Sequence, residues 1–216
     1  MDNFDLIVIG SGPGGYVAAI RAAQLGMKVA LVEKAELGGI CLNWGCIPTK
    51  ALLKNAEVWQ NLRALNEFGI TIAQPQLDFT QVIRRSREVA ARLSKGIEFL
   101  FKKNKVAVVR GYGKLRDRQT VAVVNPDDNS TTGLKARNIV IATGARPRSI
   151  PNVEIDGKRI ISSREAMILP QIPKSIIIIG AGAIGVEFAY LFNAFGVEVN
   201  LVEILPQILP IEDEEI

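Results

Sequence analysis

A short apolar strand pattern opens the chain, and a helical pattern and a second apolar run follow it. Residues 4–9 are almost continuously apolar, as expected for a strand of a parallel sheet that is buried on both faces. Residues 14–25 then place apolar side chains among alanines at helical spacing, and Gly26 ends this helix. Residues 28–32 form the second apolar run. The pattern therefore predicts a β-α-β unit built on parallel strands.

The same pattern returns near the carboxyl end of the sequence. Residues 175–179 and 198–202 predict two more strands, and residues 183–195 predict the helix between them, which Gly196 ends. Aligning the first glycine of each copy gives a shift of 180 − 10 = 170 positions. The chain thus contains an internal repeat of one supersecondary unit, and not the many short repeats of a solenoid.

Helices and further strands separate the two copies. Residues 48–66 predict a helix, and residues 80–103 predict an amphipathic one with apolar side chains at helical spacing. Three more strands are predicted, at residues 106–112, 120–124 and 136–141. Residues 125–129, made of Asn, Pro and Asp, predict a turn between the last two strands.

Composition and charge exclude several classes of protein. Of the 216 residues, 48% are apolar, which is ample for a buried core, and the net charge of +4 is too small and scattered for a nucleic-acid surface. The sequence has two cysteines and no histidine. These counts exclude a structural zinc site, and they exclude a Ser-His-Asp or Cys-His mechanism run by this chain alone.

The sequence shows no targeting or membrane signal. Asp2 and Asp5 stand where a signal peptide carries positive charge. The longest apolar stretch, residues 176–186, is shorter than the roughly 20 residues that a bilayer span requires. We therefore expect a cytoplasmic protein without a membrane partner, in which two close cysteines suggest redox chemistry.

The loop after the first strand has the spacing of a dinucleotide-binding fingerprint. Gly10, Gly12 and Gly15 match G-x-G-x-x-G between a strand and a helix, and Glu33 ends the next strand. The first glycine permits a tight turn, the second lets the backbone approach a pyrophosphate, and the third allows close packing of helix on strand. The glutamate can accept hydrogen bonds from ribose hydroxyls. A purely structural glycine turn is the alternative, which the complete strand–turn–helix–strand–acid context disfavours.

A second fingerprint occupies the second copy, with the same context. It consists of Gly180, Gly182 and Gly185, and its acid, Glu203, follows the first glycine by 203 − 180 = 23 positions, as Glu33 follows Gly10. Two copies indicate two dinucleotides, or one dinucleotide and a vestige. A carboxylate at the second strand end favours NAD over NADP, because it repels a 2′-phosphate. Glu187 has two open interpretations, a solvated helix face or a functional partner.

The two cysteines lie in a short segment rich in glycine. Cys41 and Cys46 are five positions apart with Gly45 between them, so they can meet in a disulfide that closes a small loop. Pro48 favours a first helical turn, which places Cys46 at a helix N-terminus, where the helix dipole stabilises a thiolate. Lys50 adds positive charge one turn later. The alternative is a pair of buried thiols that never react.

Residues 39–50, Gly-Ile-Cys-Leu-Asn-Trp-Gly-Cys-Ile-Pro-Thr-Lys, resemble the redox-active motif of the FAD-dependent pyridine nucleotide-disulfide oxidoreductases. Within that family, this motif is most similar to that of the dihydrolipoamide dehydrogenases. The resemblance covers the whole chain, since residues 142–144, Ala-Thr-Gly, follow a strand between the two fingerprints. It implies FAD at the first fingerprint and NAD at the second.

The resemblance also implies the roles of particular residues. A dihydrolipoyl group, carried by an acyltransferase, would attack the disulfide at Cys41, and Cys46 would leave as a thiolate and pass electrons to the flavin. Lys50 would lie near the flavin, paired with Glu187, as a third catalytic residue. The remaining cofactor contacts implied in this way are Lys34, Gly39, Gly113, Thr143 and Gly144. For Gly111 and Gly113, a turn at a strand end is the structural alternative.

These expectations together define an α/β fold with a Rossmann-like FAD-binding domain. We expect that domain and its redox-active disulfide at residues 1–146, a connection at 147–173 and an incomplete NAD-binding domain, its first β-α-β unit, at 174–216. Four prolines mark residues 145–173, and residues 162–165 fit a capping box on a short helix.

Family members are about twice as long as this chain, and the resemblance implies what their second half contributes. It carries the rest of the NAD-binding domain and a dimerisation domain, whose His–Glu pair acts across a homodimer. We therefore expect the chain alone to be inactive. Two alternatives remain: another disulfide reductase of the family, of glutathione or mercuric type, or a shortened flavin-binding module without catalysis.

Overall fold

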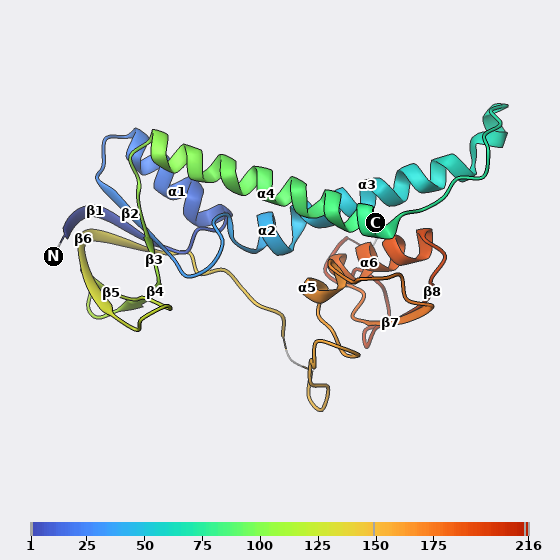
Figure 1. The fold of residues 1–216 in the computed structure, drawn as a ribbon. Helices are drawn as coiled ribbons and strands as arrows, with labels where there is room; N and C mark the ends of the chain where they lie inside the picture. The colour runs from blue at the N-terminus through green and yellow to red at the C-terminus, as the bar shows by residue number, and fades with distance from the viewer. Residues whose placement is uncertain (1, 149, 214, 216) are drawn as a thin grey trace. The chain divides into compact units, whose positions relative to one another are not determined.

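The computed structural model of the chain describes residues 2–148, 150–213 and 215 (Figure 1). Two compact units are present: Met1–Cys46 with Val89–Arg148, and Ile47–Glu88 with Ser149–Ile216. The division predicted from the sequence differs, because it keeps residues 47–88 with the first part. Two long helices, α3 (Cys46–Arg63) and α4 (Phe79–Lys103), each contribute residues to both units.

The first unit is built on a six-stranded sheet with the order β3-β2-β1-β6-β5-β4. Strand β1 pairs in parallel with β2 on one side and with β6 on the other, with Ile7 opposite Ala30 and Ile139. Strand β2 pairs in parallel with β3, whereas β5 is antiparallel to β4 and β6. The strands are β1 (Asp2–Ile9), β2 (Val29–Glu33), β3 (Ala107–Arg110), β4 (Tyr112–Leu115), β5 (Thr120–Val124) and β6 (Thr131–Ile141).

Two predicted strands differ by more than two residues from the observed ones. Residues 106–112 form no single strand, because the chain breaks at Gly111, whose φ of 152° starts β4. A Cβ at Gly111 would lie 2.7 Å from the carbonyl oxygen of Val124, so the turn needs glycine. Strand β6 begins at Thr131 and not at residue 136, since its first half pairs with β5. The turn at residues 125–129 between β5 and β6 is confirmed.

Helix α1 (Pro13–Gln24) packs on the parallel strands through small side chains, of which Ala19 is fully buried. The central strands β1 and β2 are buried on both faces, as the apolar runs predicted. Side chains of β5 and β6, including Val121 and Leu134, join those of β1 and β2 in one core. The antiparallel strands therefore share a core with the parallel sheet.

The second unit contains the second copy of the β-α-β pattern. Strands β7 (Ser175–Ile179) and β8 (Glu198–Val202) pair in parallel, and α6 (Ala183–Ala194) connects them. The core of this unit joins α6 to the adjoining parts of α3 and α4 and to α5 (Ser163–Ala166). Its largest fully buried side chains are Leu52, Met167, Leu191 and Phe192. The capping box predicted for α5 is present.

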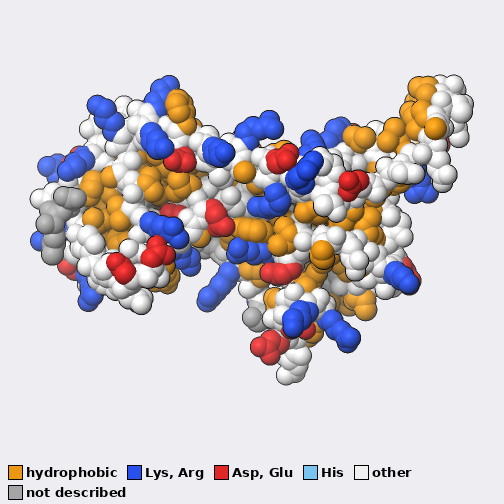
Figure 2. Space-filling view, in the orientation of Figure 1, with side chains coloured by type: hydrophobic (Ala, Val, Ile, Leu, Met, Phe, Trp, Pro, Cys, Tyr) orange, Lys and Arg blue, Asp and Glu red, His pale blue; other side chains and the backbone are white. Residues whose placement is uncertain are grey.

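A 3-10 helix, η1 (Leu65–Phe68), follows α3. Phe68 at its end and Ile70 and Ile72 just after it are exposed, and apolar side chains show at that end of the unit in Figure 2. Among the described residues, no helix is long and apolar enough to cross a membrane.

Candidate redox and dinucleotide sites

The first glycine-rich loop joins the end of β1 to the start of α1. Gly10 has a φ of +102°, and a Cβ there would collide with the carbonyl of Ala142. A Cβ at Gly15 would collide in turn with the carbonyl of Gly10. At Gly12, the N-cap of α1, an added Cβ would meet no atom within 4 Å. Two of the three glycines thus close the turn, and the third leaves its outer side open to a ligand.

The start of α1 has the features of a diphosphate site. No side chain caps this end of the helix, and its first turn contains no acidic residue. The partial positive charge of the helix N-terminus is therefore available to an anion. The loop also lies where β2 and β6 flank β1 on opposite sides, which is where open α/β sheets bind their ligands. The geometry fits a dinucleotide such as FAD.

The Ala-Thr-Gly turn after β6 lies against this loop. The N–H of Ala142 donates to the carbonyl of Ile9 at 2.8 Å, and the Cβ position of Gly10 would be 3.2 Å from the Cα of Thr143. Gly144, with a φ of +70°, follows. The fold thus brings Thr143 and Gly144 to the first fingerprint, and their contact with the cofactor remains a prediction.

Glu33 organises the loop directly. One carboxylate oxygen accepts from the N–H and the hydroxyl of Ser11, at 2.8 and 2.7 Å, and the other accepts from the N–H groups of Lys34 and Ala35. The ammonium of Lys34 lies 5.2 Å from the ring centre of Tyr112. A contact of Glu33 with ribose remains a prediction. Its position at the end of β2, beside the loop, is compatible with that role.

Gly39 and Gly113 lie close to the same loop. Gly39 has a φ of +64°, and its Cβ would lie 2.6 Å from the Cα of Gly12. Gly113 lies inside β4, where a Cβ would lie 3.0 Å from Ile9 and 3.3 Å from Val32. Only Gly111 stands at a strand end, so tight packing on β1 and β2 explains Gly113 better than a turn does.

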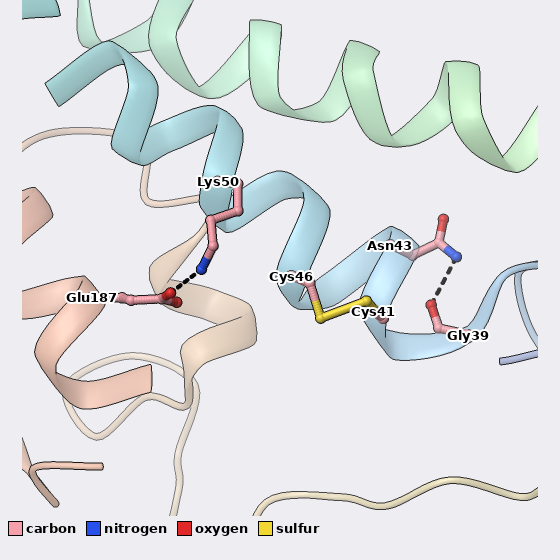
Figure 3. The surroundings of a disulfide bond; sticks show 6 residues. All are labelled: Gly39, Cys41, Asn43, Cys46, Lys50 and Glu187. Atoms are coloured by element: carbon pink, nitrogen blue, oxygen red, sulfur yellow. Dashed lines mark hydrogen bonds and ion pairs between the residues drawn. A yellow bond between two sulfur atoms is a disulfide. The ribbon is translucent and has the colours of Figure 1, made fainter. Parts of the chain in front are cut away.

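The two cysteines form a disulfide (Figure 3). Cys41 lies in the short helix α2 (Gly39–Trp44), which the sequence did not predict, and Cys46 is the first residue of α3. Their Cα atoms are 4.7 Å apart, within the range that disulfides require. Cys46 is exposed and Cys41 is half-buried, so the alternative of two buried, inert thiols is wrong.

Lys50 and Glu187 form an ion pair within the second unit (Figure 3). Lys50 lies in the first turns of α3 and Glu187 in α6. The lysine side chain is 63% exposed, so the pair contributes little to stability. Glu187 thus has a charged partner, and both of its interpretations, a solvated helix face or a role beside the flavin, stay predictions.

The second glycine-rich loop repeats the geometry of the first. Gly180 has a φ of +103°, Gly182 is the N-cap of α6, and a Cβ at Gly185 would collide with the carbonyl of Gly180. Glu203 accepts from the N–H groups of Ala181, Ile204 and Leu205 at 2.7–3.0 Å. These backbone hydrogen bonds, that of Leu205 first, hold the pKa of Glu203 below its ordinary value. The loop fits a second dinucleotide in the same way.

Sequence reasoning missed two buried polar residues. Ser11 is fully buried, and its hydroxyl joins Glu33 to the N–H of Gly38 at the start of the redox segment. Asn43 is 6% exposed and hydrogen-bonds within the segment and to α4. Nothing in the glycine-rich motif of the sequence marks Ser11 as important. Asn43 is marked by its place between the two cysteines, because an amide that becomes buried there needs polar partners.

Comparison with known proteins now assigns the family. A family model described as pyridine nucleotide-disulphide oxidoreductase matches residues 4–216. The chain belongs to this family. The pyridine nucleotide-disulphide oxidoreductases use FAD and a pyridine nucleotide, which agrees with two glycine-rich loops and a disulfide on one chain.

Curated relatives of the chain within this family are dihydrolipoyl dehydrogenases. That of Zymomonas mobilis is 54% identical over 100% of this chain and 46% of its own length, and that of Bacillus subtilis is 44% identical over 99% and 47%. A solved structure, a Cu(II) complex of the HOCl-induced flavoprotein disulfide reductase RclA from Escherichia coli, has a TM-score of 0.85 at 29% identity. It is covered over 46% of its length by 100% of this chain. The chain therefore spans about half the length of these relatives.

Proposed function

We propose that this chain carries the disulfide-exchange and flavin-binding parts of a dihydrolipoyl dehydrogenase, which oxidises dihydrolipoyl groups of 2-oxo acid dehydrogenase complexes. The observation that carries the proposal is the Cys41–Cys46 disulfide at the start of α3, in the same unit as the first glycine-rich loop. Relatives with that name, about half identical to this chain, support the choice of substrate.

Residues of the first unit would hold FAD. The N-terminus of α1 and the backbone at Gly12 would bind the diphosphate, Glu33 would accept hydrogen bonds from ribose hydroxyls, and the turn at Thr143 and Gly144 would border the cofactor. Lys34, Gly39 and Gly113 complete the proposed set. When bound, FAD supplies a two-electron acceptor for the reduced cysteine pair and a donor to the pyridine nucleotide.

The cysteine pair performs a thiol–disulfide exchange with the substrate. A substrate thiolate, whose proton has gone to solvent, bonds to the sulfur of Cys41, and the bond between Cys41 and Cys46 breaks. Cys46 leaves as a thiolate, which the N-terminus of α3 stabilises. The second substrate sulfur, as thiolate, then displaces Cys41. The dihydrolipoyl group is oxidised to its disulfide, and both cysteines are reduced.

The second unit would hold NAD. Gly180, Gly182 and Gly185 form its loop, and the carboxylate of Glu203 favours a free 2′-hydroxyl over a 2′-phosphate. Lys50 and Glu187 would act as a charged pair beside the flavin. We further propose that the protein works as a cytoplasmic homodimer and that its partner is the dihydrolipoyl domain of an acyltransferase.

Substrate exchange with the purified chain tests this proposal. Dihydrolipoamide should reduce the Cys41–Cys46 pair, detected as two alkylatable thiols, faster than glutathione does, and Cys41→Ser should abolish the reaction. Failure of the wild-type pair to exchange with any thiol would overturn the redox function. A preference for glutathione would favour another reductase of the family, which the likeness to a flavoprotein disulfide reductase from Escherichia coli also permits.

A further inference from the structure

The buried side chain of Asn43 helps to hold the short helix α2 in place. The amide nitrogen of Asn43 donates to the carbonyls of Leu37 and Gly39, at 2.9 and 3.0 Å. Figure 3 shows this amide directed at Gly39. Its oxygen accepts from the hydroxyl of Ser94 in α4 at 2.8 Å. Three hydrogen bonds therefore meet at a side chain that is only 6% exposed.

Helix α2 is too short to hold its own position. It has six residues, its N-cap Gly38 has no side-chain cap, and isolated helices of this length are unstable in water. Asn43 ties the start of the helix to the preceding chain and ties its end to α4, which has 25 residues. Since Cys41 lies two residues before Asn43, the same contacts set where Cys41 lies relative to Cys46.

We propose that Asn43, held by Ser94, is a positioning residue that prepares the cysteine pair for disulfide closure. In the disulfide form, the covalent bond itself restrains residues 41–46. In the dithiol form this bond is absent, and the hydrogen bonds of Asn43 are among the contacts that still restrain the segment. Losing them would free the dithiol form more than the disulfide form, and the closing equilibrium would shift toward the dithiol.

This inference rests on the proposed redox function, because it concerns the same cysteine pair. A positioning role for Asn43 can be distinguished from a merely structural role by the equilibrium constant of disulfide closure. A residue that stabilised both redox forms equally would change the free energy of unfolding but not the equilibrium constant of closure. Only a residue whose contacts matter more to one form changes that constant.

The test equilibrates the chain with reduced and oxidised dithiothreitol, so that the reduced cysteine pair and the oxidised reagent exchange two electrons and two protons. Alkylation then measures the fraction of disulfide. Asn43→Ala should lower the equilibrium constant for closure about tenfold, and Ser94→Ala, which leaves the amide bonds of Asn43 intact, about threefold. Ser86→Ala is the matched control, since its hydroxyl is fully buried and bonds only its own helix at Ile83.

The outcomes are distinct. A constant that falls in Asn43→Ala and Ser94→Ala but not in Ser86→Ala supports the inference. A constant equal to that of the wild type in both variants overturns it, even if urea unfolding shows that they are less stable. If Asn43→Ala does not fold by circular dichroism, Ser94→Ala alone decides. A wild-type pair that never equilibrates overturns the proposed function itself.

Discussion

The chain contains the same β-α-β unit twice, and the two copies have different surroundings. In both, the third glycine of the loop packs against the carbonyl of the first, and a glutamate at the end of the second strand accepts the N–H of the residue after the first glycine. Among the described residues, the first copy continues into a six-stranded sheet, with β3 next to β2 and β6 next to β1, whereas β7 and β8 form a sheet of two strands.

The clearest difference between the two loops is one side chain. Ser11 in the first copy corresponds to Ala181 in the second, and both are fully buried. Both loops close with the same backbone bond to glutamate, at 2.8 Å, so the loop itself does not require a hydroxyl. The hydroxyl of Ser11 instead accepts the N–H of Gly38. The serine hydroxyl thus adapts the first loop to hold the redox segment, which the second loop does not do.

The largest expected difference between the copies is at their first glycines. Gly10→Ala should cost about 4 kcal/mol, because the new Cβ adds a collision with Ala142 to the strain of a positive φ. Gly180→Ala, with the same φ but no atom within 4 Å, should cost about 2 kcal/mol. Urea unfolding followed by circular dichroism measures both. Equal costs would mean that the Ala-Thr-Gly turn does not constrain the first loop.

The third glycines should behave alike. Gly15→Ala and Gly185→Ala should each destabilise their unit by about 3 kcal/mol, since each added Cβ collides with the carbonyl of the first glycine. Gly14→Ala is the control, because its Cβ meets no atom within 4 Å, and it should stabilise α1 by about 0.5–1 kcal/mol. Hydrogen exchange of the β1 and β7 amides assigns each effect to its copy. A tolerated Gly15→Ala would contradict the shared geometry.

Ser11→Ala should make the first loop like the second. It removes a hydrogen bond to the carboxylate of Glu33 and one of two acceptors of the Gly38 N–H, at a cost of about 1.5 kcal/mol. We expect faster hydrogen exchange at Gly38 and unchanged exchange at Ala181. If only the global stability fell and the Gly38 amide stayed protected, the hydroxyl would have no specific role in holding the redox segment.

The smallest expected effect is the acid dependence of the second loop. The folded pKa of Glu203 lies below the ordinary value of 4.5, so its hydrogen bonds contribute fully above that value and are lost as the pH falls through the lowered pKa. Exchange at the Ala181 amide, corrected for its intrinsic pH dependence, should lose protection as the pH falls from 4.5 through the lowered pKa of Glu203. Glu203→Gln should remove this dependence, and its persistence in that variant would assign it to another group.

Much of the fold was predictable because its signals are local. The strands at residues 175–179, 198–202 and 120–124 were predicted with the observed bounds, and the repeat of glycines and glutamates was visible from spacing alone. Strand β6 was predicted too short, because residues 131–135 look polar and become a strand only by pairing with β5. Gly111 broke a predicted strand since its conformation depends on Val123 and Val124.

The two loops, the closeness of the two cysteines and a helix beginning near Cys46 could be predicted without the fold, because each depends on residues a few positions apart. Which distant groups meet became visible only in the folded chain. Ser94 reaches Asn43 across 51 positions, and Lys50 reaches Glu187 across 137. Such contacts follow from how helices and strands pack into a core, and no short pattern records them. The chemistry of the cysteines could therefore be predicted from the sequence, whereas the distant side chains that contact their segment could be identified only from the fold.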